Sequence, residues 1–214
     1  PDRKSDRFGI ALVLITATIV SIPIGDVGGW GRVLTVGLAG GTLLFVLHTS
    51  QAHRVTMTVA YVAVGIGLTT STVAVVAGTG RVAEAAPSLV GALLAIVAPV
   101  AIARRLLTHP AITGRTIAGA LCLYLLVGVF FAFVFAVVGA IDPPFFSEEP
   151  SEETIDYVYF SFTTVTTTGY GDLTARGPAG RMLAVSEALI GQLYLVSVVA
   201  LLVGNIGWQR QPKE

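Results

Sequence analysis

Charge is scarce in this sequence: Asp, Glu, Lys and Arg make up only 12% of its 214 residues, whereas 54% are hydrophobic. A soluble domain of similar size carries about a quarter charged residues. The missing polar surface excludes an ordinary soluble globular protein and predicts that much of the chain faces membrane lipid. Basic and acidic residues balance at 13 each, and we expect no nucleic-acid partner.

The sequence also has only one cysteine and no recognisable set of catalytic residues in its apolar segments. The single cysteine, Cys122, lies within an apolar run and has no partner for an intrachain disulfide. The apolar segments lack a Ser, His and Asp set and lack metal-ligand spacing, so we expect neither an enzyme nor a cofactor. Charges precede the first apolar run without a small-residue cleavage signature behind it, which predicts a retained membrane anchor.

What the sequence does contain is six apolar segments, each close to the roughly 20 residues that a helix needs to cross a bilayer. We place them at residues 7–24, 31–48, 55–77, 87–103, 116–141 and 179–207. A shorter segment at 154–166 cannot span, but a re-entrant element buried in protein can hold non-helical backbone at membrane depth. The predicted fold is an all-α membrane protein with six transmembrane helices and one re-entrant helix and loop.

Basic residues predict the orientation, because cytoplasmic loops carry the excess of Lys and Arg. With both termini in the cytoplasm, nine of the 13 basic residues lie inside. These are Arg3, Lys4, Arg7, Arg54, Arg104, Arg105, Arg115, Arg210 and Lys213. We therefore expect a multi-pass protein of the plasma membrane with cytoplasmic ends.

Acidic residues crowd into one predicted outer loop before the short segment. They are Asp142, Glu148, Glu149, Glu152, Glu153 and Asp156. A ring of such loops would raise the cation concentration at an external mouth. An ordinary solvated loop explains the same residues, and the sequence leaves both readings open.

A run rich in threonine and glycine, residues 161–172, joins the short segment to the last apolar segment. Stacked rings of backbone carbonyls can replace the water shell of a potassium ion. Successive carbonyls face one axis only if the backbone alternates between conformations that side chains disfavour, which Gly169 and Gly171 adopt cheaply. Thr167 adds a hydroxyl to the innermost ring, and the ring of Tyr170 is expected to turn outward and hold the loop open.

This run, Thr167-Thr168-Gly169-Tyr170-Gly171-Asp172, resembles the signature sequence of potassium channels, usually Thr-Val-Gly-Tyr-Gly followed by Asp. About half the chain, from the fifth segment through the sixth, resembles the pore module of that family, especially its small prokaryotic members. The resemblance implies a homotetramer, because each chain has one copy of the filter. It implies a pore domain at 111–214 and a voltage-sensor-like bundle at 1–110, with potassium bound at Thr167, Thr168, Gly169 and Tyr170.

The resemblance also implies roles around the filter. Tyr159 and Phe160 fall where an aromatic cuff braces it, while Asp172 and Arg181 match the acidic residue after the filter and the basic residue at the start of the inner helix. This chain departs from the family at Thr168, where valine is commoner and where the hydroxyl needs a partner behind the filter. It also has Thr163 where many prokaryotic members place a glutamate.

Two residues of the last segment are singled out by chemistry. Glu187 is ionisable inside an apolar helix, which marks it as a functional candidate. We expect it to reach the hydroxyls of the short helix and brace the filter, although a neighbouring helix backbone could also satisfy it. Gly191 matches the family's hinge glycine, and small-residue packing would explain it equally well.

The inner face of the last segment is predicted from helical spacing. Gln192, Leu195, Val199 and Val203 lie at i, i+3, i+7 and i+11. This face would line a water-filled cavity, with Gln192 beneath the filter and a hydrophobic ring at Val203 that could close by dewetting. Simple helix packing is the alternative for this apolar stripe.

The fourth segment, 87–103, contains no arginine, whereas voltage-gated channels carry one at every third position there. Each charge that crosses the field contributes about 2.3 kcal/mol per 100 mV. We therefore expect a potassium channel that is not steeply voltage-gated. A nonselective cation channel and a potassium transporter subunit are the alternative functions.

Overall fold

The structure, a computed structural model, describes residues 8–26, 29–50, 53–77, 95–101, 114–148 and 153–208. Across these residues the regular structure is helical, and the one extended feature is an isolated bridge between Phe146 and Ala175. The helices are α1 (Phe8–Asp26), α2 (Gly29–Thr49), α3 (Arg54–Ala77), α5 (Gly114–Ile141), α6 (Thr154–Val165) and α7 (Pro178–Trp208). Residues 95–101 are helical as well.

Three of these helices contain stretches long and apolar enough to cross a membrane, namely Arg54–Val73, Ile117–Ile141 and Pro178–Val198. α1 and α2 contain shorter apolar stretches. The predicted six spans go beyond this finding, and most of the predicted fourth segment lies outside the described residues. α6 has 12 residues and therefore extends only about 18 Å at 1.5 Å per residue, too short to span.

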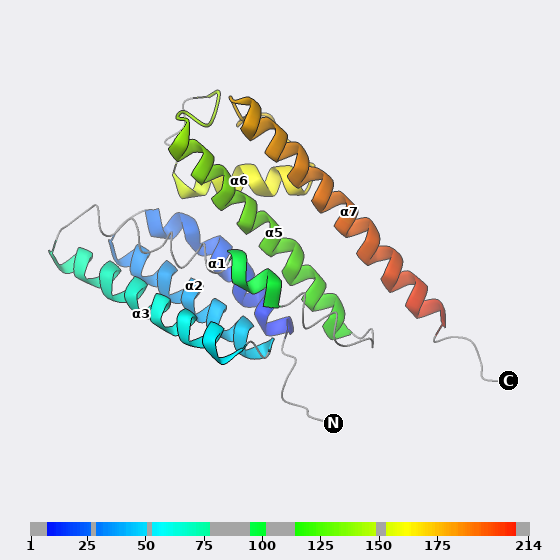
Figure 1. The fold of residues 1–214 in the computed structure, drawn as a ribbon, viewed down its shortest axis with the longest axis horizontal. Helices are drawn as coiled ribbons and strands as arrows, with labels where there is room; N and C mark the ends of the chain where they lie inside the picture. Colours follow the sequence, from blue (N-terminus) through cyan, green and yellow to red (C-terminus); the bar gives the residue numbers. More distant parts are fainter. Residues whose placement is uncertain are drawn as a thin grey trace.

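The first three helices pack against one another in chain order, and α1 also packs against α5 (Figure 1). Gly40 allows α2 and α3 to approach closely, because a Cβ there would lie 2.6 Å from the side chain of Val64. Nothing lies within 4 Å of the corresponding position at Gly41 or Gly65. Small residues therefore matter at one point of this contact, not along its whole length.

The first hydrophobic core joins α1, α2 and α3 to α5. Buried Ile15 and Leu43 belong to the same cluster as Cys122 and Leu126. The thiol of Cys122 donates to the backbone oxygen of Phe8 at 3.6 Å. α1 thus packs against α5 of its own chain, and this core crosses the predicted boundary between residues 110 and 111.

A second, aromatic core holds α6 in place. Phe160 of α6 lies 5.0 Å from Phe135 of α5 between ring centroids, and Phe145 lies 4.9 Å from Phe146 in the segment between the two helices. Aromatic rings that meet edge to face add about 0.5–1.5 kcal/mol per pair beyond their buried area. Figure 1 shows the result, with α6 lying across between α5 and α7 near one end of both helices.

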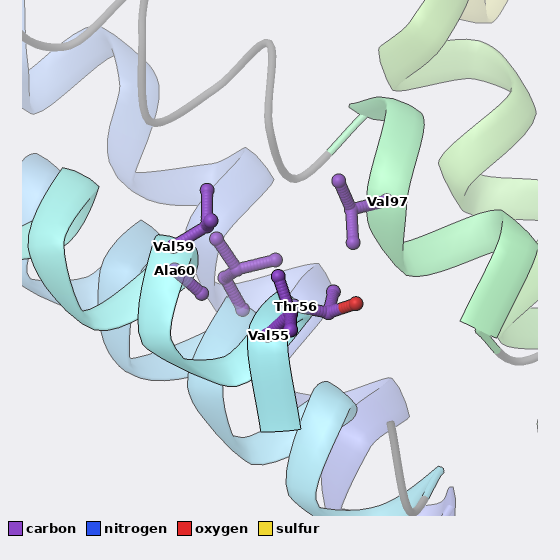
Figure 2. Close-up of a pocket in the computed structure, with 6 residues that line it drawn as sticks. Val55, Thr56, Val59, Ala60 and Val97 are labelled. Carbon is purple, nitrogen blue, oxygen red and sulfur yellow. The ribbon is translucent and has the colours of Figure 1, made fainter. Parts of the chain in front are cut away.

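An apolar pocket of about 210 Å³ lies beside α3. It is lined by Leu43, Val55, Thr56, Val59, Ala60 and Val97. Figure 2 shows Val97, on the short helix at residues 95–101, across the opening from the labelled residues of α3. The lining offers the hydroxyl of Thr56 and is otherwise hydrocarbon.

Candidate functional site

The loop that follows α6 is positioned by that helix. At its start, the backbone N–H of Glu153 donates to Asp156 Oδ2 at 3.1 Å. At its end, Thr166 N–H bonds back to Phe162 O at 3.3 Å. The carbonyl end of a helix carries partial negative charge, and here that end leads directly into residues 167–172.

The backbone of the loop alternates in conformation. φ is +56° at Thr167, +51° at Gly169 and +79° at Gly171. Glycine enters this left-handed region at little cost, but a β-branched residue such as threonine is a genuine outlier there. Thr167 is held by its N–H, which donates to Thr164 O at 2.9 Å. Strain at such a position marks a candidate functional site.

Thr163 anchors the loop through its main chain. Its carbonyl accepts the N–H groups of Thr168 and Gly169 at 2.9 and 3.0 Å, while its hydroxyl turns back to Phe160 O at 3.0 Å. Thr163 therefore contacts the loop through its backbone oxygen and not through its side chain.

The hydroxyl of Thr168 finds its partner within the loop, on Thr166. Their Oγ1 atoms lie 2.9 Å apart. Thr166 Oγ1 also lies 2.6 Å from Phe162 O, which can only accept. Because Thr166 has one hydroxyl proton and donates it to that carbonyl, Thr168 must donate to Thr166.

At the far end of the loop, Tyr159 Oη donates to Asp172 Oδ2 at 2.7 Å. This bond raises the pKa of Tyr159 to about 12. The Tyr159 ring also stacks on Tyr170, with centroids 6.3 Å apart and planes 7° from parallel. Phe160, the other predicted cuff residue, is buried in the aromatic core, so it fixes α6 and Tyr159 is the residue that meets the loop.

The segment after the loop is tied to the segment before α6. Glu148 accepts from Thr174 N–H at 2.7 Å and from its hydroxyl at 2.9 Å. The backbone bond from Thr174 is the main reason why the pKa of Glu148 is lowered. Arg181 Nε donates to Ala175 O at 2.9 Å. Glu148 thus has a structural contact, whereas Glu149 and Glu152 lie outside the described residues.

Glu187 lies in the contact between α7, α6 and α5. Its side chain is 0% exposed. Oε1 lies 2.5 Å from Ser161 Oγ, which in turn lies 2.6 Å from Gly128 O on α5. The contact joins all three helices of this region, and the filter-bracing role of Glu187 remains a prediction.

Gly191 lies where α7 passes close to the end of α6. A Cβ at this position would be 2.6 Å from Val165 O and 2.7 Å from Val165 Cγ2. α7 continues as one helix from Pro178 to Trp208. Because a Cβ would clash with Val165, this close approach requires glycine at position 191. The hinge role of Gly191 stays a prediction.

The predicted cavity face is only partly described. Gln192 is exposed and Leu195 is half-buried. The side chains of Val199 and Val203 lie outside the described part of the structure. The predicted cavity and gate therefore stay predictions.

Sequence reasoning missed several residues that this arrangement uses. Ser161 and Thr166 appeared only as members of the threonine-rich run. Tyr124 Oη donates to Val165 O at 3.0 Å, and Tyr194 Oη donates to Ala120 O at 2.6 Å. A polar tip on an otherwise apolar helix was the available signal for both tyrosines. Within the described ranges no cluster of His, Cys, Asp or Glu could hold a metal.

Comparison with known proteins places this region in a functional class. Residues 119–206 match a protein-family model described as an ion channel. The match begins in α5, includes α6 and the loop, and ends in α7. Together with the apolar helices, it supports a membrane-embedded ion channel and, with that, a non-enzymatic role. No curated protein and no solved structure matches the chain.

Proposed function

We propose that the chain is one subunit of a homotetrameric, potassium-selective channel of the plasma membrane. Potassium ions would bind at the main-chain oxygens of Thr167, Thr168, Gly169 and Tyr170 and pass down their gradient. The alternating backbone of this loop, held at the end of α6 inside the ion-channel match, is the observation on which the proposal depends. Carbonyl rings of this kind replace the hydration shell of the ion.

A complete ion site needs several copies of the chain, and the number four comes from the resemblance to potassium channels. One loop provides carbonyls on one side of an ion only, so several loops must meet around a common axis. The side chain of Tyr170 is 72% exposed in the single chain, and Leu193 of α7 is 66% exposed. Apolar surface beside the loop is consistent with neighbouring subunits or lipid covering it.

Conduction is proposed to be weakly dependent on voltage, since the segment 87–103 has no arginine to move through the field. α1, α2 and α3 then form a peripheral bundle that packs on α5. Both chain ends are proposed to be cytoplasmic.

Ion flux into liposomes tests the proposal. Purified protein should admit potassium down a gradient and admit sodium far more slowly. Gly169→Ala should abolish selective flux, because alanine disfavours the positive φ at this position. Gly65→Ala is the matched control, since nothing lies within 4 Å of a Cβ there.

Other outcomes separate the alternatives. Equal potassium and sodium flux would indicate a nonselective cation channel, and saturable turnover would indicate a transporter subunit. A protein that is monomeric in membranes would refute the tetrameric filter.

A further inference from the structure

Ser161 has one hydroxyl proton but two very close oxygen neighbours. Gly128 O is 2.6 Å away and Glu187 Oε1 is 2.5 Å away. Both distances are those of strong O–H···O hydrogen bonds. A backbone carbonyl can only accept, and an ionised carboxylate can only accept. One hydroxyl proton cannot form two bonds this short at once, so a second proton is needed in this contact.

The second oxygen of Glu187 leads to the same result independently. Oε2 is buried and has no hydrogen-bond partner among the described residues. No Lys or Arg in that part of the chain forms an ion pair with it. A buried unpaired carboxylate is far more costly than a buried neutral carboxyl with one unpaired carbonyl oxygen.

We infer that Glu187 is protonated in the folded protein and donates its proton from Oε1 to Ser161, which donates its own to Gly128 O. This chain of two hydrogen bonds, the Glu187 bridge, links α7 to α6 and α6 to α5. Ser161 lies on the helix that leads directly into residues 167–171, so the bridge positions α6. The proton is a structural ligand, and this holds whether or not the protein conducts potassium.

The surroundings favour the neutral form. From α5, the ionisable group that faces Glu187 is the phenol of Tyr124, whose proton is committed to Val165 O. The charged residue of α6, Asp156, lies at the opposite end of that helix from Val165. On α7, Arg181 donates to Ala175 O in the segment that precedes this helix.

Loss of the proton breaks the bridge. Ser161 can then satisfy either the carboxylate or Gly128 O, but not both, and a charge remains buried between three helices. A folded state that holds a proton which the unfolded chain releases becomes less stable as the pH rises. The consequence for conduction, a loss of flux in alkaline solution, rests on the proposed function.

Infrared spectroscopy of the reconstituted full chain tests the proton directly. The difference spectrum between the native chain and Glu187→Gln at neutral pH should contain the C=O band of a protonated carboxyl. Ser161→Ala should shift this band, because the hydrogen bond that the carboxyl donates is removed. A carboxylate signal in place of the protonated band would overturn the inference, and so would a band that Ser161→Ala leaves unmoved.

Thermal unfolding against pH provides a second measurement that does not depend on ion flux. Native stability should fall as the pH rises above about 4–5, the ordinary carboxyl range of the unfolded chain, with a slope that approaches one proton per chain. The slope should disappear once Glu187 is ionised in the folded protein as well. Glu187→Gln should lose this slope, since its amide can donate to Ser161 and cannot release a proton. An equal slope in both proteins over this pH range would overturn the inference. Failure of potassium flux alone, with these results intact, would count against the proposed function and not against the bridge.

Discussion

Replacing Gly191 by alanine tests whether this glycine serves close packing or bending. The new Cβ would lie 2.6 Å from Val165 O, a separation that real Cβ atoms essentially never show. Val165 O is a backbone atom at the end of α6, so no rotation of a side chain relieves the contact. α7 must move away from α6 by several tenths of an ångström, next to residues 167–172, the proposed filter.

Two opposing effects set the magnitude. Overpacking a well-packed contact costs about 1–3 kcal/mol. Alanine in place of glycine favours a helix by about 1 kcal/mol. The backbone clash leads us to expect a net loss of about 1–2 kcal/mol. For a chain of this size that corresponds to a fall in melting temperature of about 2–8 °C.

Thermal unfolding and potassium flux should be measured together for Gly191→Ala. Gly65→Ala is the control, because its helix position has open surroundings, and it should be neutral or slightly stabilising. The double variant Val165→Ala/Gly191→Ala should lose less stability than the sum of the two single variants. Val165→Ala removes Cγ2, one of the two atoms that the new Cβ meets, but leaves the carbonyl oxygen. If Gly191→Ala is as stable as Gly65→Ala and only slows opening, the packing role is wrong and bending is its function.

Three further changes follow from other contacts. Tyr159→Phe removes the hydrogen bond to Asp172, and potassium current should decay faster during prolonged conduction; unchanged decay would exclude a bracing role. In Phe8→Cys, the new cysteine should form a disulfide with Cys122 of the same chain on oxidation, because Cys122 Sγ lies 3.6 Å from Phe8 O. Disulfide-linked dimers on a non-reducing gel would instead show that α1 packs on a neighbouring subunit. The pKa of Glu148 is lowered in the folded protein, so its contribution to stability is present above the unfolded pKa and is lost as the pH falls through the folded pKa. Glu148→Gln should therefore reduce the loss of stability on acidification. An unchanged loss would assign it to another group.

Much of the helical layout could be predicted from composition. The predicted segment 31–48 corresponds to α2, Gly29–Thr49, and the predicted segment 179–207 corresponds to α7, Pro178–Trp208. A helix that satisfies its own backbone is one of few structures that an apolar run can adopt in lipid. The count of six spans is not established, because composition and length identify three candidate spans among the described residues.

Contacts between helices could not be predicted from local pattern. Ser161 pairs with Gly128, 33 residues earlier, and only the packing of α6 on α5 brings them together. Gly191 matched a family position, but its neighbour Val165 was not visible in the sequence. Glycine spacing predicts that two helices approach closely but does not identify the partner helix. An ionisable residue in an apolar helix predicts a hydrogen-bond partner but does not identify the residue that provides it.

The threonine at position 168 shows how a local change can leave the proposed ion path intact. Valine at this place would be held by hydrocarbon packing alone, whereas Thr168 donates to Thr166, which donates to Phe162 O. The added hydroxyl is thus satisfied by a residue two positions away and imposes no polar demand on a neighbouring subunit. The Thr168 N–H donates to Thr163 O. Because selectivity in the proposed filter depends on carbonyl oxygens, the side chain at 168 changes how the loop is supported and not what an ion would meet.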